Sequence, residues 1–190
     1  MTGSKSNILI IGSTGRNTGK TEFACRIIEK HATQKEIVAV KIIPVDKNEV
    51  ECHRGLEGCG LCNSLTGDYK IIEETTTDSL KDTSRMLKAG ANKAYLLLVD
   101  RKSLEKGIRA LLGLLPDNVM VVIESNSVRK VLAPGLFIVI KDFTTNSVKQ
   151  TCAEVMELAD KLVGFDNMKW DFPPDNVKIQ SERWIIQESG

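Results

Sequence analysis

The sequence has few aromatic residues and almost no net charge. Phe, Trp and Tyr together make up 5% of its 190 residues, and 26 Lys and Arg residues balance 25 Asp and Glu residues to leave a formal charge of +1. Such a balance does not favour a nucleic-acid or an acidic membrane surface, so any anion site must be local. We therefore expect no nucleic-acid partner.

Long apolar runs are also lacking. Runs such as residues 94–99 and 119–123 are far shorter than the roughly 20 residues that a membrane-spanning helix needs. The first residues contain neither the apolar stretch nor the small-residue cleavage site of an export signal. These features predict a cytoplasmic protein without a membrane partner.

The remaining composition is that of a globular protein. Hydrophobic residues make up 42% of the chain and charged residues 27%, which excludes wholesale disorder and collagen-like repetition. A chain of this length fits one hydrophobic core. Its five cysteines form an odd and unevenly spaced set, unlike the disulfide framework of a secreted domain.

Short apolar segments alternate with helical patterns along most of the chain, which predicts an α/β fold of parallel strands and crossover helices. Pro44 is expected to end the second strand, and the wholly apolar segment 94–99 is expected to be central in the sheet. The predicted strands are 7–12, 36–43, 94–99, 119–124 and 136–140, and the predicted helices are 19–31, 78–89, 104–115 and 148–163.

Two regions interrupt this alternation. Residues 44–70 contain three cysteines and many glycines without a periodic pattern, so they are interpreted as an inserted Cys-rich loop within a domain of residues 1–165. Residues 166–190 contain both tryptophans, Trp170 and Trp184, on either side of a Pro-Pro-Asp-Asn turn. This segment is predicted to be a C-terminal arm or hairpin.

The segment between the first strand and the first helix is typical of a phosphate-binding loop. Its backbone N–H groups and the helix dipole can hold a polyanion, Lys20 adds a point charge, and the Thr21 hydroxyl can bind Mg²⁺. Thr14 stands where the P-loop motif has its first glycine. The predicted nucleotide-binding residues are Gly12, Thr14, Gly15, Arg16, Asn17, Thr18, Gly19, Lys20 and Thr21.

A Mg²⁺ ion at Thr21 needs a carboxylate from the C-terminal end of a neighbouring strand. Asp100 and Glu124 each follow an apolar run, and Asp46 follows the second strand. We expect Asp100 to bind the metal, and Lys20, Asp100 and Glu124 to act in phosphoryl chemistry, with at least one strand-end carboxylate at the metal. The fold is accordingly expected to be a three-layer fold of the P-loop NTPase type.

Three segments together carry a family resemblance. Residues 17–21, residues 81–91 with Lys-Asp-Thr-Ser-Arg and Ala-Gly-Ala, and residues 122–124 occur in the order found in MobB, the molybdopterin-guanine dinucleotide biosynthesis protein B family. The chain resembles this family over residues 7–140. The resemblance implies GTP binding with weak hydrolysis, a homodimer, and a partner protein of molybdenum cofactor biosynthesis. The family's Lys-His pair after the second strand is here Lys41-Ile42.

The nucleotide base and the reaction stay open at this point. The chain has no Asn-Lys-x-Asp segment that would select guanine, so the nucleotide is GTP or ATP. Residues 14–21 also look like the phosphate loop of dethiobiotin and cobyrinic-acid amide synthases, which use ATP to activate carboxylates. A third possibility is a non-catalytic adaptor for metal delivery that changes with its nucleotide state.

The Cys-rich loop has the spacing of a metal site. Cys59 and Cys62 form a Cys-x-x-Cys pair whose two sulfurs can bind one ion, and Cys52 or His53 would complete a tetrahedral set. Thiolate ligands suit both Zn²⁺ and an iron–sulfur cluster. We therefore expect residues Cys52, His53, Cys59 and Cys62 to bind one of these metals.

Overall fold

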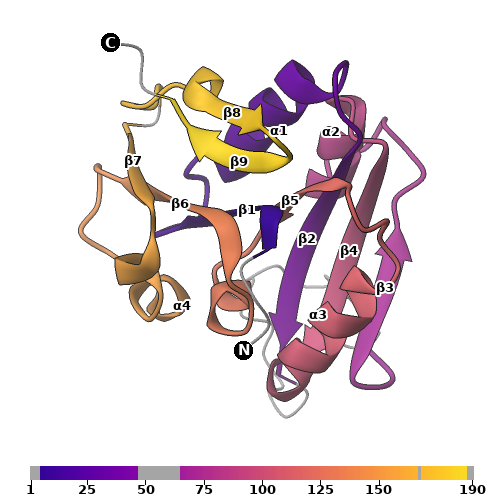
Figure 1. Cartoon of the computed structure of the whole chain (residues 1–190). Helices are drawn as coiled ribbons and strands as arrows, with labels where there is room; N and C mark the ends of the chain where they lie inside the picture. The colour runs from indigo at the N-terminus through magenta and orange to yellow at the C-terminus, as the bar shows by residue number, and fades with distance from the viewer. Residues whose placement is uncertain (1–4, 47–64, 167, 188–190) are drawn as a thin grey trace.

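The computed structural model describes residues 5–46, 65–166 and 168–187, which form an α/β fold around one large sheet (Figure 1). Within these residues the sheet has seven strands in the order β3-β4-β2-β5-β1-β6-β7, and all neighbours are parallel except β3 and β4. The predicted class, α/β with a mostly parallel central sheet, is confirmed. The strands are β1 (Lys5–Ser13), β2 (Ile37–Val45), β3 (Tyr69–Glu73), β4 (Lys93–Asp100), β5 (Met120–Glu124), β6 (Pro134–Asp142) and β7 (Lys161–Phe165).

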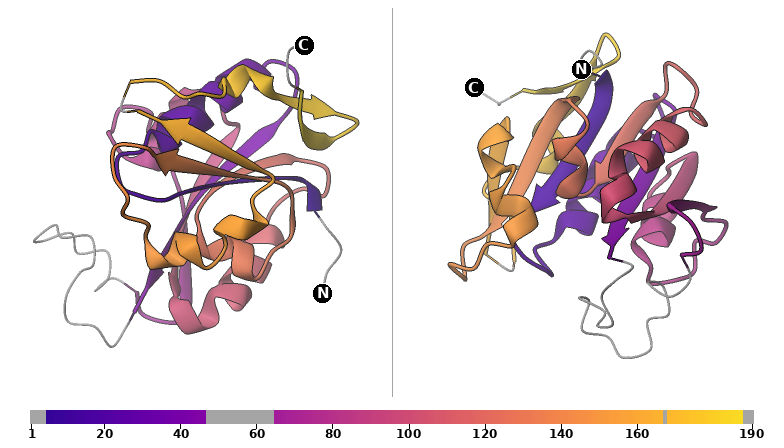
Figure 2. Two further views of the ribbon diagram at one scale, coloured as in Figure 1. Left: turned by 90° about the vertical axis from the view of Figure 1, so that its left-hand side faces the viewer. Right: turned by 90° about the horizontal axis from the view of Figure 1, so that it is seen from below.

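Helices cover both faces of this sheet. In Figure 2, α1 and a C-terminal hairpin lie on one side of the sheet, and α3 and α4 lie on the other. Helix α2 packs with α1. Since both faces are covered, the strands can be apolar throughout rather than alternating with polar residues. The helices are α1 (Lys20–His31), α2 (Asp82–Lys88), α3 (Leu104–Leu112) and α4 (Gln150–Ala153).

Alternate residues of the central strands supply two separate hydrophobic cores. Leu9 and Ile11 of β1 pack with α1, whereas Ile8 and Ile10 pack on the opposite face with α3. This is the two-residue period of an extended strand. Both cores therefore hold β1 rigidly, so that its C-terminal end has a fixed position relative to the neighbouring strands.

The C-terminal residues form an antiparallel hairpin of β8 (Val177–Gln180) and β9 (Arg183–Ile186). Trp184 is buried and donates a 3.0 Å hydrogen bond from Nε1 to the Asn7 carbonyl at the start of β1. Its ring also makes an edge contact with His31 at the end of α1. The hairpin thus packs on the same core as α1.

The prediction of one helix over residues 148–163 is wrong. Only Gln150–Ala153 is α-helical, a short 3₁₀ turn follows, and residues Lys161–Phe165 are the edge strand β7, paired with β6. The apolar residues that suggested one helical face lie on opposite faces of the sheet, Cys152 and Val155 on one and Val163 on the other. Spacing alone did not reveal that the chain crosses between layers here.

Three smaller predictions also need correction. Pro44 does not end the second strand but lies inside β2 opposite Val99. Since β2 pairs with β5 only as far as Lys41, the side of β2 that faces β5 is unpaired at Pro44. A residue without an N–H group is therefore accommodated at this position. The segment 94–99 is not central, since β4 lies next to the edge strand β3. The predicted helix 78–89 begins at Asp82, and Leu80 is exposed.

Candidate functional site

The Gly-rich loop, residues 14–19, connects the end of β1 to the first residue of α1. Gly19 precedes the helix with φ +70°, and Asn17 is also left-handed with φ +56°. Gly19 is also close to the Trp170 and Phe165 rings, which a Cβ would approach to 3.2–3.3 Å. Gly19 is the N-cap of α1 and has no side chain that could bond to the first N–H groups of the helix. These N–H groups are therefore oriented to bind an anion.

The first residues of the predicted nucleotide site have structural roles instead. Gly12 lies inside β1, where a Cβ would come within 2.5 Å of the Asn126 Oδ1 atom. That amide accepts from the Ser13 N–H at 2.7 Å and donates to the Ser13 carbonyl at 2.9 Å. The buried Thr14 bonds through its N–H to the Ile140 carbonyl, and its hydroxyl accepts from the Asp142 N–H.

Gly12, Thr14 and Gly15 consequently do not line the cavity described below, whereas residues 16–21 do. The Gly15 carbonyl accepts a 2.7 Å hydrogen bond from the Ser13 hydroxyl. The three residues outside the cavity lining have other contacts: Thr14 bonds to β6, Gly15 accepts from Ser13, and Gly12 leaves room for the Asn126 amide that holds Ser13.

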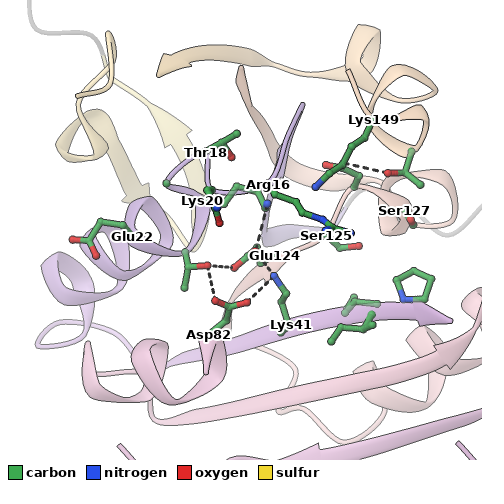
Figure 3. A pocket seen from close by; sticks show the side chains of 18 of the residues that line it. Arg16, Thr18, Lys20, Glu22, Lys41, Asp82, Glu124, Ser125, Ser127 and Lys149 are labelled. Atoms are coloured by element: carbon green, nitrogen blue, oxygen red, sulfur yellow. Dashed lines mark hydrogen bonds and ion pairs between the residues drawn. The ribbon is translucent and has the colours of Figure 1, made fainter. Parts of the chain in front are cut away.

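Lys20, the first residue of α1, points back toward the end of β1. Its Nζ donates to the Ser13 hydroxyl at 2.9 Å. The same Nζ lies 3.7 Å from Glu124 Oε1 (Figure 3). Burial lowers the pKa of Lys20, while the negative charge of Glu124 opposes that shift. An ammonium group held in this way lies beside the helix N-terminus, where a phosphate would bind.

The Thr21 hydroxyl lies between two carboxylates. Its Oγ1 is 2.8 Å from Glu124 Oε2 and 3.0 Å from Asp82 Oδ1 (Figure 3). Glu124 is at the end of β5, the strand directly beside β1, and its side chain is 1% exposed. Asp82 is the first residue of α2. Two carboxylates and a hydroxyl are oxygen donors of the kind that Mg²⁺ takes together with substrate phosphates.

Lys41 completes this cluster from the middle of β2. Its Nζ is 3.0 Å from Asp82 Oδ2 and forms a close ion pair with Glu124 Oε1. Burial alone would raise the pKa of Asp82, but the Lys41 charge and the hydrogen bonds from Lys41 and Thr21 outweigh it and lower that pKa. Asp82 is therefore ionised in the neutral range.

Neither Lys41 nor Asp82 was predicted as a site residue. Lys41 is the single charged residue of β2, and a cation within an otherwise apolar buried strand is a signal in itself. Asp82 belongs to the Lys-Asp-Thr-Ser-Arg segment, which supported the family resemblance without a role being assigned to it.

The structure contradicts the expectation that Asp100 joins this cluster. Asp100 ends β4, which β2 and β5 separate from β1. Three inter-strand steps of about 4.8 Å put it well beyond reach of a metal at Thr21. Its carboxylate instead accepts the Lys102 N–H at 3.0 Å and caps a 3₁₀ turn. Asp46, the third candidate, pairs with Arg101 at 3.0 Å.

A cavity of about 800 Å³ opens over this cluster. Six cationic side chains and three carboxylates line it, so its surface is electropositive. Burial, reinforced by the charges of Lys20, Arg16 and Lys41, lowers the pKa of Lys149 to about 8. The charged lining residues are Arg16, Lys20, Lys41, Arg85, Arg101 and Lys149, together with Glu22, Asp82 and Glu124.

Thr18 adds an unsatisfied polar group to the cavity wall. Its residue is 1% exposed, and its hydroxyl has no hydrogen-bond partner among the described residues. A buried hydroxyl without a partner is costly, which favours a ligand that supplies one. Together with the excess of cations, this hydroxyl fits a polyanionic ligand with oxygen acceptors.

The predicted metal ligands Cys52, His53, Cys59 and Cys62 lie outside the described residues. Within the described part of the chain, Cys25 and Cys152 are buried free thiols, and no group of three or more His, Cys, Asp or Glu side chains is placed to hold a metal. The pair Asp82 and Glu124 with the Thr21 hydroxyl is a smaller donor set of a different kind.

No protein-family model matches the chain, and no curated protein or solved structure matches it either. In residues 5–46, 65–166 and 168–187, no helix has both the length and the apolar character to cross a bilayer.

Proposed function

We propose that this protein binds a Mg²⁺–nucleoside triphosphate in the cavity over α1 and hydrolyses it slowly. The observation that carries the proposal is the meeting of Lys20, Thr21 and Glu124 at the N-terminus of α1. A largely buried ammonium with 18% of its side chain exposed, a hydroxyl and a strand-end carboxylate at a helix N-terminus are the parts that phosphoryl chemistry requires. GTP and ATP are both candidates.

The roles of individual residues follow from their positions. The N–H groups of residues 16–21 and the Lys20 ammonium would hold the phosphates, and the Thr18 hydroxyl would gain the partner that it lacks among the described residues. Thr21, Glu124 and Asp82 would hold Mg²⁺. When bound, the metal supplies positive charge to the oxygens of the transferred phosphoryl group.

Turnover without a second component should be slow, because the carboxylates of the cavity are already engaged. Glu22 pairs with Arg85 at 2.7 Å, while Asp82 and Glu124 both pair with Lys41. A general base for water must be able to accept a proton in the transition state. The contacts with Lys41 and Thr21 lower the pKa of Asp82, which makes it a poor proton acceptor.

Substitution of Lys20 is the direct test. We expect Lys20→Ala to weaken the binding of fluorescent ATP and GTP analogues by about 100-fold, since it removes a charged contact to the phosphates. Lys106→Ala is the matched control, because Lys106 is an exposed residue of α3 that pairs with Asp68. Measurement is by titration with and without Mg²⁺. Equal affinity of Lys20→Ala and the parent protein would refute the proposed function.

A second candidate, ATP-dependent activation of a carboxylate, is favoured by the extent of the cavity. Beyond Lys41 the wall continues along Ile43 and Pro44 to Arg101, away from the Gly-rich loop. An arginine there could bind an organic acid that accepts the phosphoryl group. This candidate predicts ADP formation that depends on added carboxylic acid, whereas hydrolysis and a nucleotide-dependent adaptor role do not.

A further inference from the structure

Lys41 occupies the place where the cluster most needs a positive charge. Its side chain is 15% exposed and reaches from β2 to Glu124 on the neighbouring strand and to Asp82 on α2. The register pairs Lys41 directly with Glu124, so the contact is built into the sheet. The position of the ammonium is therefore fixed by the backbone rather than by a flexible loop.

Asp82 and Glu124 carry like charges, which this ammonium offsets. Thr21 Oγ1 lies within 3.0 Å of both, but its single proton can be donated to only one of them at a time. Lys20 is 3.7 Å from Glu124 and contributes less than Lys41, which is closer to Glu124 and also contacts Asp82. Lys41 is the cation that contacts both carboxylates among the described residues.

We infer that Lys41 is a positioning residue that acts as an internal counter-ion, which a divalent metal must displace to bind Asp82 and Glu124. The inference builds on the proposed function, because the displaced ammonium gains a new partner only when a triphosphate is also present. Metal and triphosphate should then bind cooperatively. The metal alone should bind weakly.

The physical basis is competition between cations for the same oxygens. Asp82 Oδ2 and Glu124 Oε1 are both engaged by Lys41. A divalent ion that coordinates these side chains lies within a few ångströms of the ammonium, where like charges repel strongly in a partly buried site. Phosphate oxygens next to Lys41 remove that repulsion. By linkage, the metal must then raise the affinity for triphosphate by the same factor.

The test is Mn²⁺ binding in the absence of nucleotide, followed by electron paramagnetic resonance. We expect Lys41→Met to bind Mn²⁺ about tenfold more tightly than the parent protein, because the competing charge is gone. Lys41→Arg, which restores a cation, should bind Mn²⁺ about as weakly as the parent. Lys106→Met removes an equal charge from the exposed face of α3 and should change nothing.

A second readout covers the possibility that Lys41→Met folds poorly. Without Lys41 two carboxylates repel each other, so Mn²⁺ should raise the melting temperature of Lys41→Met and of Lys41→Gln more than that of the parent. Equal Mn²⁺ affinity in all variants, no Mn²⁺ binding by any of them, or an equal thermal shift overturns the inference. Failure of the proposed function would give a different result: no triphosphate would bind, whether or not Mn²⁺ binds.

Discussion

Two strands of this sheet end in the same residue pattern, but their terminal carboxylates have different contacts. β4 and β5 both carry an apolar run that finishes with a carboxylate, Asp100 in one and Glu124 in the other. Glu124 is 1% exposed and bonds to Thr21, whereas Asp100 caps the short turn that follows its strand. The difference comes from strand order, because β5 lies next to β1 and β4 does not.

The comparison shows that a strand-end carboxylate becomes a site residue through its neighbours. The partner of Glu124 in β1 is Ile11, one residue before Gly12, so its side chain is brought to the start of the Gly-rich loop and α1. Asp100 is paired with Val45 at the far end of β2. The same residue pattern therefore produces a charged cluster in one place and a turn cap in the other.

The largest effect should come from Glu124→Gln. This change keeps the shape and the hydrogen bond from Thr21 but removes the charge that Lys41 and Lys20 contact. We expect Mg²⁺-dependent phosphate release to fall by about 100-fold or more, since charge stabilisation by the metal is worth several kcal/mol. Release assays with GTP and ATP measure it. A release rate within about threefold of that of the parent protein would show that Glu124 contributes no more to phosphate release than Asp100 is expected to.

Gly12→Ala tests how β1 and the residues after β5 are joined. The added Cβ would lie 2.5 Å from Asn126 Oδ1 and 3.2 Å from Phe137 Cε2, so the amide that holds Ser13 must move. Overpacking of this kind costs about 1–3 kcal/mol of unfolding free energy. Denaturant titration measures the loss. Gly113→Ala is the control, because its nearest neighbour would be 3.4 Å away.

The residues at the two strand ends also show which parts of the site the sequence predicts. Lys20, Thr21 and Glu124 were predicted because local spacing places the first two at a helix N-terminus, and because an apolar run announces the strand before Glu124. Asp100 matched that second pattern equally well. The choice between them depends on sheet order, a long-range property that the order of segments along the chain does not contain.

Lys41 and Asp82 show a second limit. They come from β2 and α2 and meet only because both elements pack beside β5 and α1. The residues of β7 also fit the pattern of a helix. Their apolar spacing near 3.6 residues arises here because the chain passes from one face of the sheet to the other. Local patterns predicted most elements, while contacts between elements decided the site.

Lys149 allows the electropositive end of the cavity to be tested through pH. Its pKa is about 8 in the free protein, and a bound polyanion must raise that pKa. Binding then takes up a proton above pH 8, so triphosphate affinity should fall several-fold as pH rises from about 8 to about 9.5. Calorimetric titration measures it. In Lys149→Met the dependence should be flatter.

Arg101→Met is the matched control for that pH profile. Arg101 lines the same cavity beside β4 and pairs with Asp46, but an arginine does not titrate in this range. Its variant should therefore keep the slope of the parent protein above pH 8. An unchanged slope in Lys149→Met would mean that a different group takes up the proton. The phosphates would then not raise the pKa of Lys149.

The smallest effect on nucleotide chemistry should come from substitutions of Asp100 at the end of β4. Asp100→Asn keeps an oxygen acceptor for the Lys102 N–H and should leave both stability and phosphate release within about twofold of the parent. Asp100→Ala removes the acceptor and should lower the unfolding free energy by about 0.5–1 kcal/mol, again with unchanged phosphate release per folded molecule. Thermal unfolding and release assays on the same preparations separate the two effects. A loss of Mg²⁺-dependent release in Asp100→Asn comparable to that in Glu124→Gln would contradict this account, because β4 is held between β3 and β2 and its carboxylate lies too far from Thr21 to reach the metal.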